Sequence, residues 1–187
     1  RGDILKSLLI SDLDGTLLTS KECISGYSLE RLNEWIDKGL LFTYATARSF
    51  NSAAKACWGL RQIYPVILYN GAVIIEAKSG RMLCNNHFNA GQLAFLKDLF
   101  ARHDVWPLAY SFCGEKERVS WVEGKESEGV LRYLRRRQGD PRLNPIRVCE
   151  EVAGDDIFYF NCIGRKEDLD ALRKEVDESF DIKCIYE

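Results

Sequence analysis

Three short apolar runs divide the first 70 residues, and residues at helical spacing fill the stretches between them. The runs cover residues 7–11, 40–45 and 66–69, and their length is typical of buried strands. Between the runs, the spacing of apolar residues predicts two helices, over residues 25–39 and 49–57. Strands that alternate with helices predict parallel pairing with right-handed crossovers.

Each of these predicted strands ends at a polar residue. The three residues are Asp12, Thr46 and Asn70. Ligands of open parallel sheets bind at the carboxyl ends of the strands. We therefore expect the three side chains to share one rim of the sheet.

The pattern changes after Gly71. Residues 73–76 and 81–84 predict a hairpin, and amphipathic helices then alternate with short strands. Helices are predicted over residues 92–103, 129–138 and 167–180, and strands over residues 109–112, 118–122, 157–163 and 182–186. The sequence thus predicts an α/β unit over residues 1–84 and an α+β unit over residues 85–187.

Composition and charge fit an ordinary globular protein. The chain has 187 residues, of which 46% are hydrophobic and 29% are charged. A net charge of −2 gives no overall attraction to nucleic acid or to anionic membranes. No apolar run approaches the roughly 18 residues that span a bilayer. We expect neither nucleic acid nor membrane as a partner, and the sequence does not indicate an oligomeric state.

The seven cysteines indicate free thiols. Their number is odd, no C-x-x-C pair occurs, and the two histidines, His87 and His103, complete no zinc pattern. The favoured interpretation is reduced thiols that are mostly buried, and hence a cytoplasmic protein.

The stretch Asp12-Leu13-Asp14-Gly15-Thr16 carries the chemistry. Phosphoryl transfer needs a nucleophile in line with the scissile bond and a cation that neutralises the phosphate oxygens. One carboxylate can be that nucleophile, through an aspartyl-phosphate, while a second carries protons to the leaving oxygen and from water. Mg²⁺ is held by one or two carboxylates together with phosphate and water.

Two other interpretations of this stretch compete with phosphoryl transfer. A calcium loop that began at Asp12 would need glycine at its sixth position and glutamate at its twelfth. Leu17 and Cys23 stand there, which excludes that loop. An ordinary polar turn after a strand explains Asp14-Gly15, but it does not explain two aspartates at the end of the strand that opens the fold.

Residues 10–18 resemble the first motif of the haloacid dehalogenase-like superfamily of aspartate-nucleophile phosphatases. Residues 42–48 are similar to its second motif, in which a strand ends in threonine, and residues 69–72 are similar to the Asn-Gly turn of its Cof-type branch. The resemblance implies a Rossmann-like parallel core sheet, incomplete in this chain, over residues 1–84. It also implies an inserted α+β cap domain over residues 85–187.

The resemblance implies roles for the residues of the first two motifs. Asp12 would be the nucleophile and a Mg²⁺ ligand. Asp14 would be the general acid and base, with its main-chain carbonyl on the metal. The Leu13 amide and the Thr46 hydroxyl would bind the phosphate.

Three more candidate site residues follow from the resemblance. Ala47 stands where the branch usually has glycine, and its methyl group would narrow the space beside the phosphate. Arg48 would pair with the substrate or, alternatively, be a solvated arginine that opens a helix. Asn70 would line the site or, alternatively, be a turn residue in the left-handed conformation.

Two further groups of side chains have both a structural and a functional interpretation. The four arginines between residues 132 and 137 form either a solvated helix face or a surface that attracts an anionic substrate. Trp106 and Trp121 either pack against other side chains or offer a platform for substrate.

Two later motifs of the superfamily, a lysine and a Gly-Asp-rich loop that adds a metal ligand, have no counterpart here. Gly154-Asp155-Asp156 is the nearest string, and it precedes an apolar strand of the cap. We therefore expect that the chain is a fragment without the C-terminal core motifs, that its first strand has an open edge, and that it is a poor catalyst by itself.

The leading hypothesis is a Mg²⁺-dependent phosphatase of a small phosphorylated metabolite. Sugar phosphates are the first choice, on the resemblance alone. One alternative is a non-catalytic relative that binds a metabolite or a protein partner, and another is a sugar phosphomutase.

Overall fold

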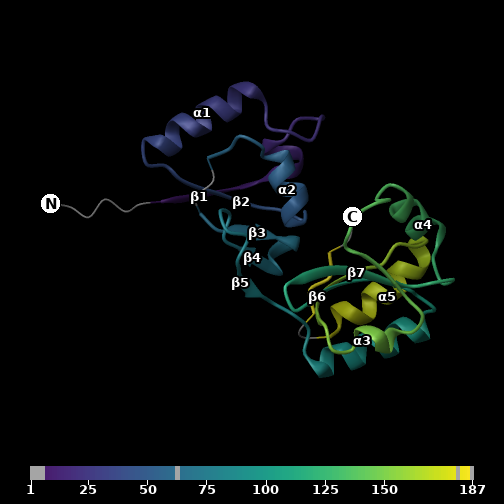
Figure 1. Ribbon diagram of the computed structural model, residues 1–187. Coiled ribbons are helices and arrows are strands. Elements are labelled where there is room, and N and C mark those ends of the chain that lie inside the picture. The colour runs from purple at the N-terminus through teal and green to yellow at the C-terminus, as the bar shows by residue number, and fades with distance from the viewer. Residues whose placement is uncertain (1–6, 62–63, 180–181, 186–187) are drawn as a thin grey trace. The chain divides into compact units, whose positions relative to one another are not determined.

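The computed structural model describes residues 7–61, 64–179 and 182–185. The chain folds into two compact units, residues 1–86 and residues 87–187 (Figure 1). Each unit has its own sheet. The predicted α/β class is confirmed.

A five-stranded sheet in the order β1-β2-β3-β4-β5 forms the first unit. Its first three strands are parallel, and β3, β4 and β5 form an antiparallel meander. All five strands were predicted from the apolar runs. They are β1 (Leu8–Asp12), β2 (Leu41–Ala45), β3 (Val66–Leu68), β4 (Val73–Ile75) and β5 (Met82–Asn85).

Two capped helices connect the parallel strands. Helix α1 (Gly26–Asp37) and helix α2 (Phe50–Ala56) each begin after a serine. The Ser25 hydroxyl accepts a hydrogen bond from the third residue of α1, and the Ser49 hydroxyl does the same for α2. Such caps satisfy amides that have no partner within the helix.

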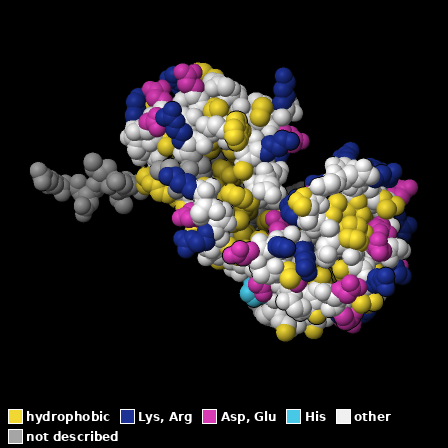
Figure 2. All heavy atoms as spheres, in the orientation of Figure 1, with side chains coloured by type: hydrophobic (Ala, Val, Ile, Leu, Met, Phe, Trp, Pro, Cys, Tyr) yellow, Lys and Arg dark blue, Asp and Glu magenta, His cyan; other side chains and the backbone are white. Residues whose placement is uncertain are grey.

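The strand β1 is the least covered part of this sheet. In the described part of the chain it pairs only with β2. Leu8, Leu9 and Ile10 are 47%, 50% and 48% exposed, whereas Phe42 and Tyr44 on β2 are buried. Figure 2 shows hydrophobic side chains open to solvent in the first unit, where Figure 1 places β1.

In the residues that the structure describes, the second unit has a four-stranded sheet in the order β8-β7-β6-β9 and three α-helices. Strand β6 pairs antiparallel with β7 and β9, and β7 pairs in parallel with β8. The strands are β6 (Leu108–Cys113), β7 (Lys116–Val122), β8 (Leu143–Ile146) and β9 (Asp156–Asn161), and the helices are α3 (Ala90–Arg102), α4 (Glu128–Arg135) and α5 (Lys166–Asp177).

Helices α3 and α5 pack together (Figure 1). Leu96 and Leu99 of α3 form a buried cluster with Leu172 and Val176 of α5. Phe160 of β9 packs against this cluster and fixes the two helices to the sheet.

One strand prediction for this unit was wrong, and one strand was missed. Residues 182–185 form no strand, and Tyr186 lies outside the described residues. The strand β8 was not predicted, because Asn144 and Pro145 interrupt its apolar pattern. Proline is tolerated there because β8 is the edge strand and does not need every amide for the sheet.

None of the helices in the described part of the chain combines the length and the apolar character that crossing a bilayer requires.

Candidate active site

The turn after β1 presents two aspartates to solvent. Leu13–Leu17 form a wide turn, which the Leu18 amide closes by donating to the Leu13 carbonyl at 2.9 Å. The Leu13 side chain is fully buried and anchors the turn, while Asp12 and Asp14 on either side of it are exposed. Gly15 has a φ of +75°, where any side chain would strain the backbone.

Asp12 ends β1 and accepts a hydrogen bond from across the turn. The Thr16 hydroxyl donates to Asp12 Oδ2 at 3.2 Å. In the parallel ladder Asp12 lies opposite Ala45, the last residue of β2. Asp12 is therefore a neighbour of the residues that follow β2.

Thr46 joins the carboxyl ends of β2 and β3. It is buried, its amide donates to the Ile67 carbonyl at 3.0 Å, and its carbonyl accepts from the Asn70 amide at 3.0 Å. Its hydroxyl accepts from the Arg48 amide at 3.2 Å. The rim expected from the sequence is thus held together by main-chain hydrogen bonds.

Arg48 and Asp14 form a two-point ion pair. Arg48 Nε donates to Asp14 Oδ2 at 2.8 Å, and Nη2 donates to Oδ1 at 2.6 Å. The same guanidinium donates to Glu22 at 3.3 Å and to the Ser52 hydroxyl at 3.2 Å. The pair connects the turn after β1 to the start of α2 across 34 residues of sequence.

The ion pair also changes the electrostatics of both groups. The hydrogen bonds from Arg48 lower the pKa of the Asp14 carboxyl below its usual value, against a smaller opposing effect of burial. The carboxylate in turn raises the pKa of Arg48. In this arrangement Asp14 is held in its ionised form.

Asn70 lies in the short turn after β3. Its φ is 56° and that of Tyr69 is 50°, so the left-handed turn considered for Asn70 is present. The Asn70 side-chain Nδ2 is buried and has no hydrogen-bond partner among the described residues. A buried donor without a partner is costly, and a phosphate oxygen is the kind of acceptor that would satisfy it.

Ala47 is exposed between Thr46 and Arg48. Because the Thr46 hydroxyl accepts from the Arg48 amide, Ala47 sits at the apex of a tight turn. This position leaves its methyl group in solvent.

The arrangement includes two residues that sequence reasoning missed. Ser52 lies on the first turn of α2, four residues after Arg48, and this closeness in sequence could have indicated the contact. Nothing in the sequence indicated the contact of Glu22 with Arg48. Glu22 lies in the turn that the Leu18–Ile24 bridge closes, and the fold brings this turn to Arg48.

Metal binding depends on the donors near Asp12. In the described ranges there is no cluster of three or more His, Cys, Asp or Glu side chains that could hold an ion. An exposed carboxylate and a main-chain carbonyl still fit Mg²⁺, which accepts few protein ligands when phosphate and water supply the others. Asp12 and the Asp14 carbonyl are such donors, while the Asp14 carboxylate is engaged by Arg48.

Solved structures share this fold at low sequence identity. BT1666 from Bacteroides thetaiotaomicron, described among phosphatases of the haloalkanoate enzyme superfamily, is similar with a TM-score of 0.71 and 19% identity, over 94% of this chain and 62% of its own. TM0651 from Thermotoga maritima is similar with a TM-score of 0.67 and 22% identity, over 90% and 60%. BT4131, described as a subclass IIB sugar phosphatase, is similar with a TM-score of 0.63 and 15% identity, over 91% and 63%.

The chain therefore spans 60%, 62% and 63% of the lengths of these three structures. By sequence, none of the curated proteins matches the chain. The haloacid dehalogenase-like hydrolase family matches residues 9–186, from the strand that delivers Asp12 and Asp14 to nearly the last residue. The chain belongs to the haloacid dehalogenase-like hydrolases, as the resemblance of its motifs predicted.

Proposed function

We propose that this protein is a Mg²⁺-dependent phosphatase that hydrolyses a small phosphorylated metabolite through an aspartyl-phosphate on Asp12. The observation that carries the proposal is the convergence of Asp12, Asp14, Thr46 and Arg48 at one rim of the sheet. Family membership supports the hydrolase class.

In the first step an Asp12 carboxylate oxygen attacks the phosphorus, and the bond from phosphorus to the ester oxygen breaks. Protonated Asp14 gives its proton to the leaving oxygen. In the second step water attacks the phosphorus of the aspartyl-phosphate while Asp14 accepts the proton of the water. Inorganic phosphate leaves and the Asp12 carboxylate is restored.

The phosphate would be held by neutral donors around the rim. The Leu13 amide, the Thr46 hydroxyl and the partnerless Asn70 Nδ2 are the candidates. Ala47 borders the phosphate in this proposal. Arg48 would exchange one of its bonds to Asp14 for a bond to the substrate.

The Asp12 carboxylate and the Asp14 carbonyl would hold Mg²⁺. When bound, the ion neutralises charge on the phosphate oxygens. Among the described residues, no third His, Cys, Asp or Glu side chain completes a metal-binding cluster with them.

We propose a sugar phosphate as the substrate class. The support is one structural relative described as a sugar phosphatase. Residues 85–187 are the cap domain in this proposal. We also propose a cytoplasmic location, which is supported by the seven cysteines, all of them free thiols.

A second candidate is a non-catalytic protein that binds a metabolite. The observation that favours it is the engagement of Asp14 by Arg48, because an ionised Asp14 cannot donate a proton. The two candidates differ in whether phosphate is released.

Release of p-nitrophenol from p-nitrophenyl phosphate, with and without Mg²⁺, tests the proposal. We expect metal-dependent release that Asp12→Asn abolishes and that Asp156→Asn, at an exposed carboxylate in the second unit, leaves unchanged. A readout without turnover is ¹⁹F NMR of beryllofluoride, which should bind to wild-type protein with Mg²⁺ and not to Asp12→Asn. Binding of beryllofluoride with little release of p-nitrophenol would match the poor catalysis expected of this chain, whereas absence of both signals would favour the non-catalytic candidate. Faster transfer to added free sugar than to water would indicate a phosphomutase.

A further inference from the structure

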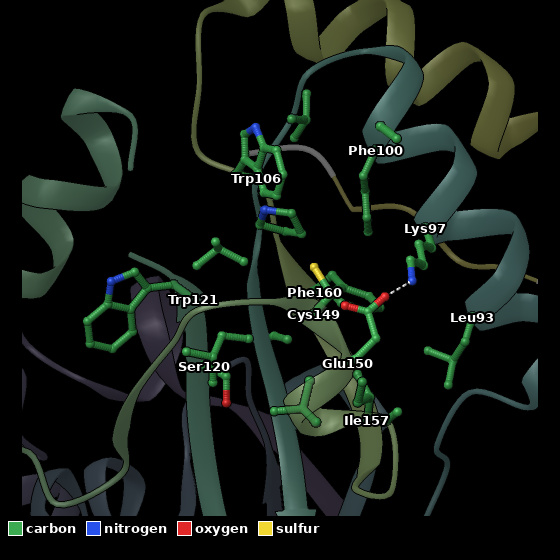
Figure 3. A pocket seen from close by; sticks show the side chains of 18 of the residues that line it. Leu93, Lys97, Phe100, Trp106, Ser120, Trp121, Cys149, Glu150, Ile157 and Phe160 are labelled. Atoms are coloured by element: carbon green, nitrogen blue, oxygen red, sulfur yellow. Dashed lines mark hydrogen bonds and ion pairs between the residues drawn. The ribbon is translucent and has the colours of Figure 1, made fainter. Parts of the chain in front are cut away.

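An apolar groove lies in the second unit, between helix α3 and the sheet (Figure 3). Its volume is about 410 Å³, which is in the range of small-molecule sites. The floor is the buried cluster of Ala109, Ile146, Val152 and Ile157, and Leu93 of α3 packs against it. A ligand with an apolar body would remove this surface from water.

Two tryptophans border the groove and present apolar ring surface to it. Trp106 and Trp121 both line it (Figure 3). The Trp106 Nε1–H donates to Asp104 at 2.9 Å, and the Trp121 Nε1–H donates to Glu126 at 2.9 Å. Since neither acceptor lines the groove, both indoles have their polar atom satisfied outside it.

The polar groups of the groove are few. The Ser120 hydroxyl already accepts a hydrogen bond from Asn144 Nδ2 at 2.9 Å. Among the lining residues, all of them in the part of the chain that the structure describes, only Lys97 and Glu150 are charged. They form an ion pair from α3 to the 3₁₀ turn Cys149–Val152, and each side chain is 62% exposed (Figure 3).

This pair of charges selects the head group of the ligand. An anion that bound Lys97 would lie beside the negative charge of Glu150, and a cation that bound Glu150 would lie beside Lys97. A molecule with both charges on neighbouring atoms would pair with each residue and leave neither charge without a partner. An α-amino acid carries such a head group, and an apolar side chain matches the walls.

We propose that this groove is a binding site for a free apolar α-amino acid, whose carboxylate pairs with Lys97, whose ammonium pairs with Glu150, and whose side chain lies against the apolar floor. The site is separate in sequence from Asp12, Asp14 and Thr46, and it does not depend on the proposed phosphatase activity.

Isothermal titration of the whole chain with L-phenylalanine tests the proposal. We expect saturable binding of one molecule per chain. Two probes each lack one charge: 3-phenylpropionate has no ammonium, and 2-phenylethylamine has no carboxylate. Both should bind at least tenfold more weakly, and glycine, which has the head group without the side chain, should not bind measurably.

Variants at the groove distinguish the contribution of the two charges to binding from that of the apolar surface. Lys97→Met and Glu150→Gln should each weaken binding at least tenfold, while Lys174→Met, at an exposed lysine of α5, should not. Ala94→Trp places a large side chain at the groove and should abolish binding, and Ala171→Trp, on the exposed face of α5, is its matched control. Circular dichroism confirms that each variant is folded.

Cysteine alkylation gives a second readout within one molecule. Cys149 lines the groove, while Cys23 is exposed in the first unit. L-Phenylalanine should slow the reaction of iodoacetamide with Cys149 and leave that of Cys23 unchanged. The proposal is overturned if L-phenylalanine shows no saturable binding, if either single-charge probe binds as tightly, or if binding survives Ala94→Trp.

Discussion

Arg48 binds both carboxylate oxygens of Asp14, through Nε at 2.8 Å and Nη2 at 2.6 Å. The Arg48 side chain is only 16% exposed, and that of Asp14 is 54% exposed. A planar guanidinium suits this two-point contact, which a lysine could not reproduce. The pair joins the turn that follows Asp12, the proposed nucleophile, to the start of the helix after the second strand.

The first prediction concerns stability against pH. Arg48 lowers the folded-state pKa of Asp14, so the pair stabilises the fold above the unfolded-state pKa of about 3.9. That contribution is lost as pH falls through the lower folded-state value. Because Asp14 is half exposed and solvent screens the pair, we expect about 1 kcal/mol or less at pH 7.

Urea unfolding of the wild type and of Asp14→Asn at pH 7 and near pH 2 measures this contribution. The difference in free energy of unfolding should shrink toward zero in acid. A difference that grew on acidification would show that the pair is not the source of the effect.

The second prediction concerns the proton that Asp14 carries. Arg48→Met should raise the pKa of Asp14 toward its ordinary value, because the hydrogen bonds that favour the carboxylate are gone. Protonated Asp14 then persists to higher pH. With an alkyl phosphate, whose leaving oxygen needs that proton, the basic limb of the kcat profile should move to higher pH.

Arg61→Met is the control for this profile, since it removes an arginine that pairs with Asp37 at the surface. Its profile should match that of the wild type. An unchanged basic limb in Arg48→Met would argue against Asp14 as the general acid.

The third prediction separates the two roles of Asn70. Its φ of 56° favours asparagine or glycine, so Asn70→Ala should cost about 1 kcal/mol of stability, whereas Asn70→Gly should cost little. If Nδ2 also binds phosphate, both variants should weaken the binding of inorganic phosphate by a similar factor. Unfolding and phosphate titration of the two variants measure the effects, and full phosphate affinity in Asn70→Gly would leave Asn70 only its role in the turn.

The fourth prediction concerns the edge of the first sheet. Leu8, Leu9 and Ile10 are about half exposed on a strand that has one partner in the described structure. Exposed apolar edge strands promote association, so the chain should self-associate as its concentration rises. Leu9→Lys should reduce this self-association, as measured by sedimentation velocity. Leu83→Lys, at another exposed leucine, should reduce the self-association less. Equal effects of the two variants would show that β1 is not the contact.

Much of the fold could be predicted because its signals are local. The strand β1 follows from an apolar run, and the helices α1 and α2 follow from apolar residues at helical spacing. The strand β8 could not be predicted, because Asn144 and Pro145 gain their strand conformation only by pairing with β7. The conformation of such segments is determined by tertiary pairing and not by intrinsic propensity.

The candidate site likewise has a part that could be predicted from the sequence and a part that could not. Asp12, Thr46 and Asn70 could be placed together because parallel strands share a rim. The partner of Arg48 could not be chosen from the sequence, which left substrate and solvent as alternatives. Asp14 lies 34 residues away, and only the fold brings the two side chains into contact.

The most direct measurement is borohydride trapping of the acyl-phosphate. The protein is mixed with p-nitrophenyl phosphate and Mg²⁺, reduced with borohydride, and digested for mass spectrometry. The proposed mechanism predicts homoserine at position 12 and nowhere else, since borohydride reduces an aspartyl-phosphate to the alcohol. An unmodified Asp12 in a sample that releases phosphate, or homoserine at another aspartate, would contradict the assignment of Asp12 as the nucleophile.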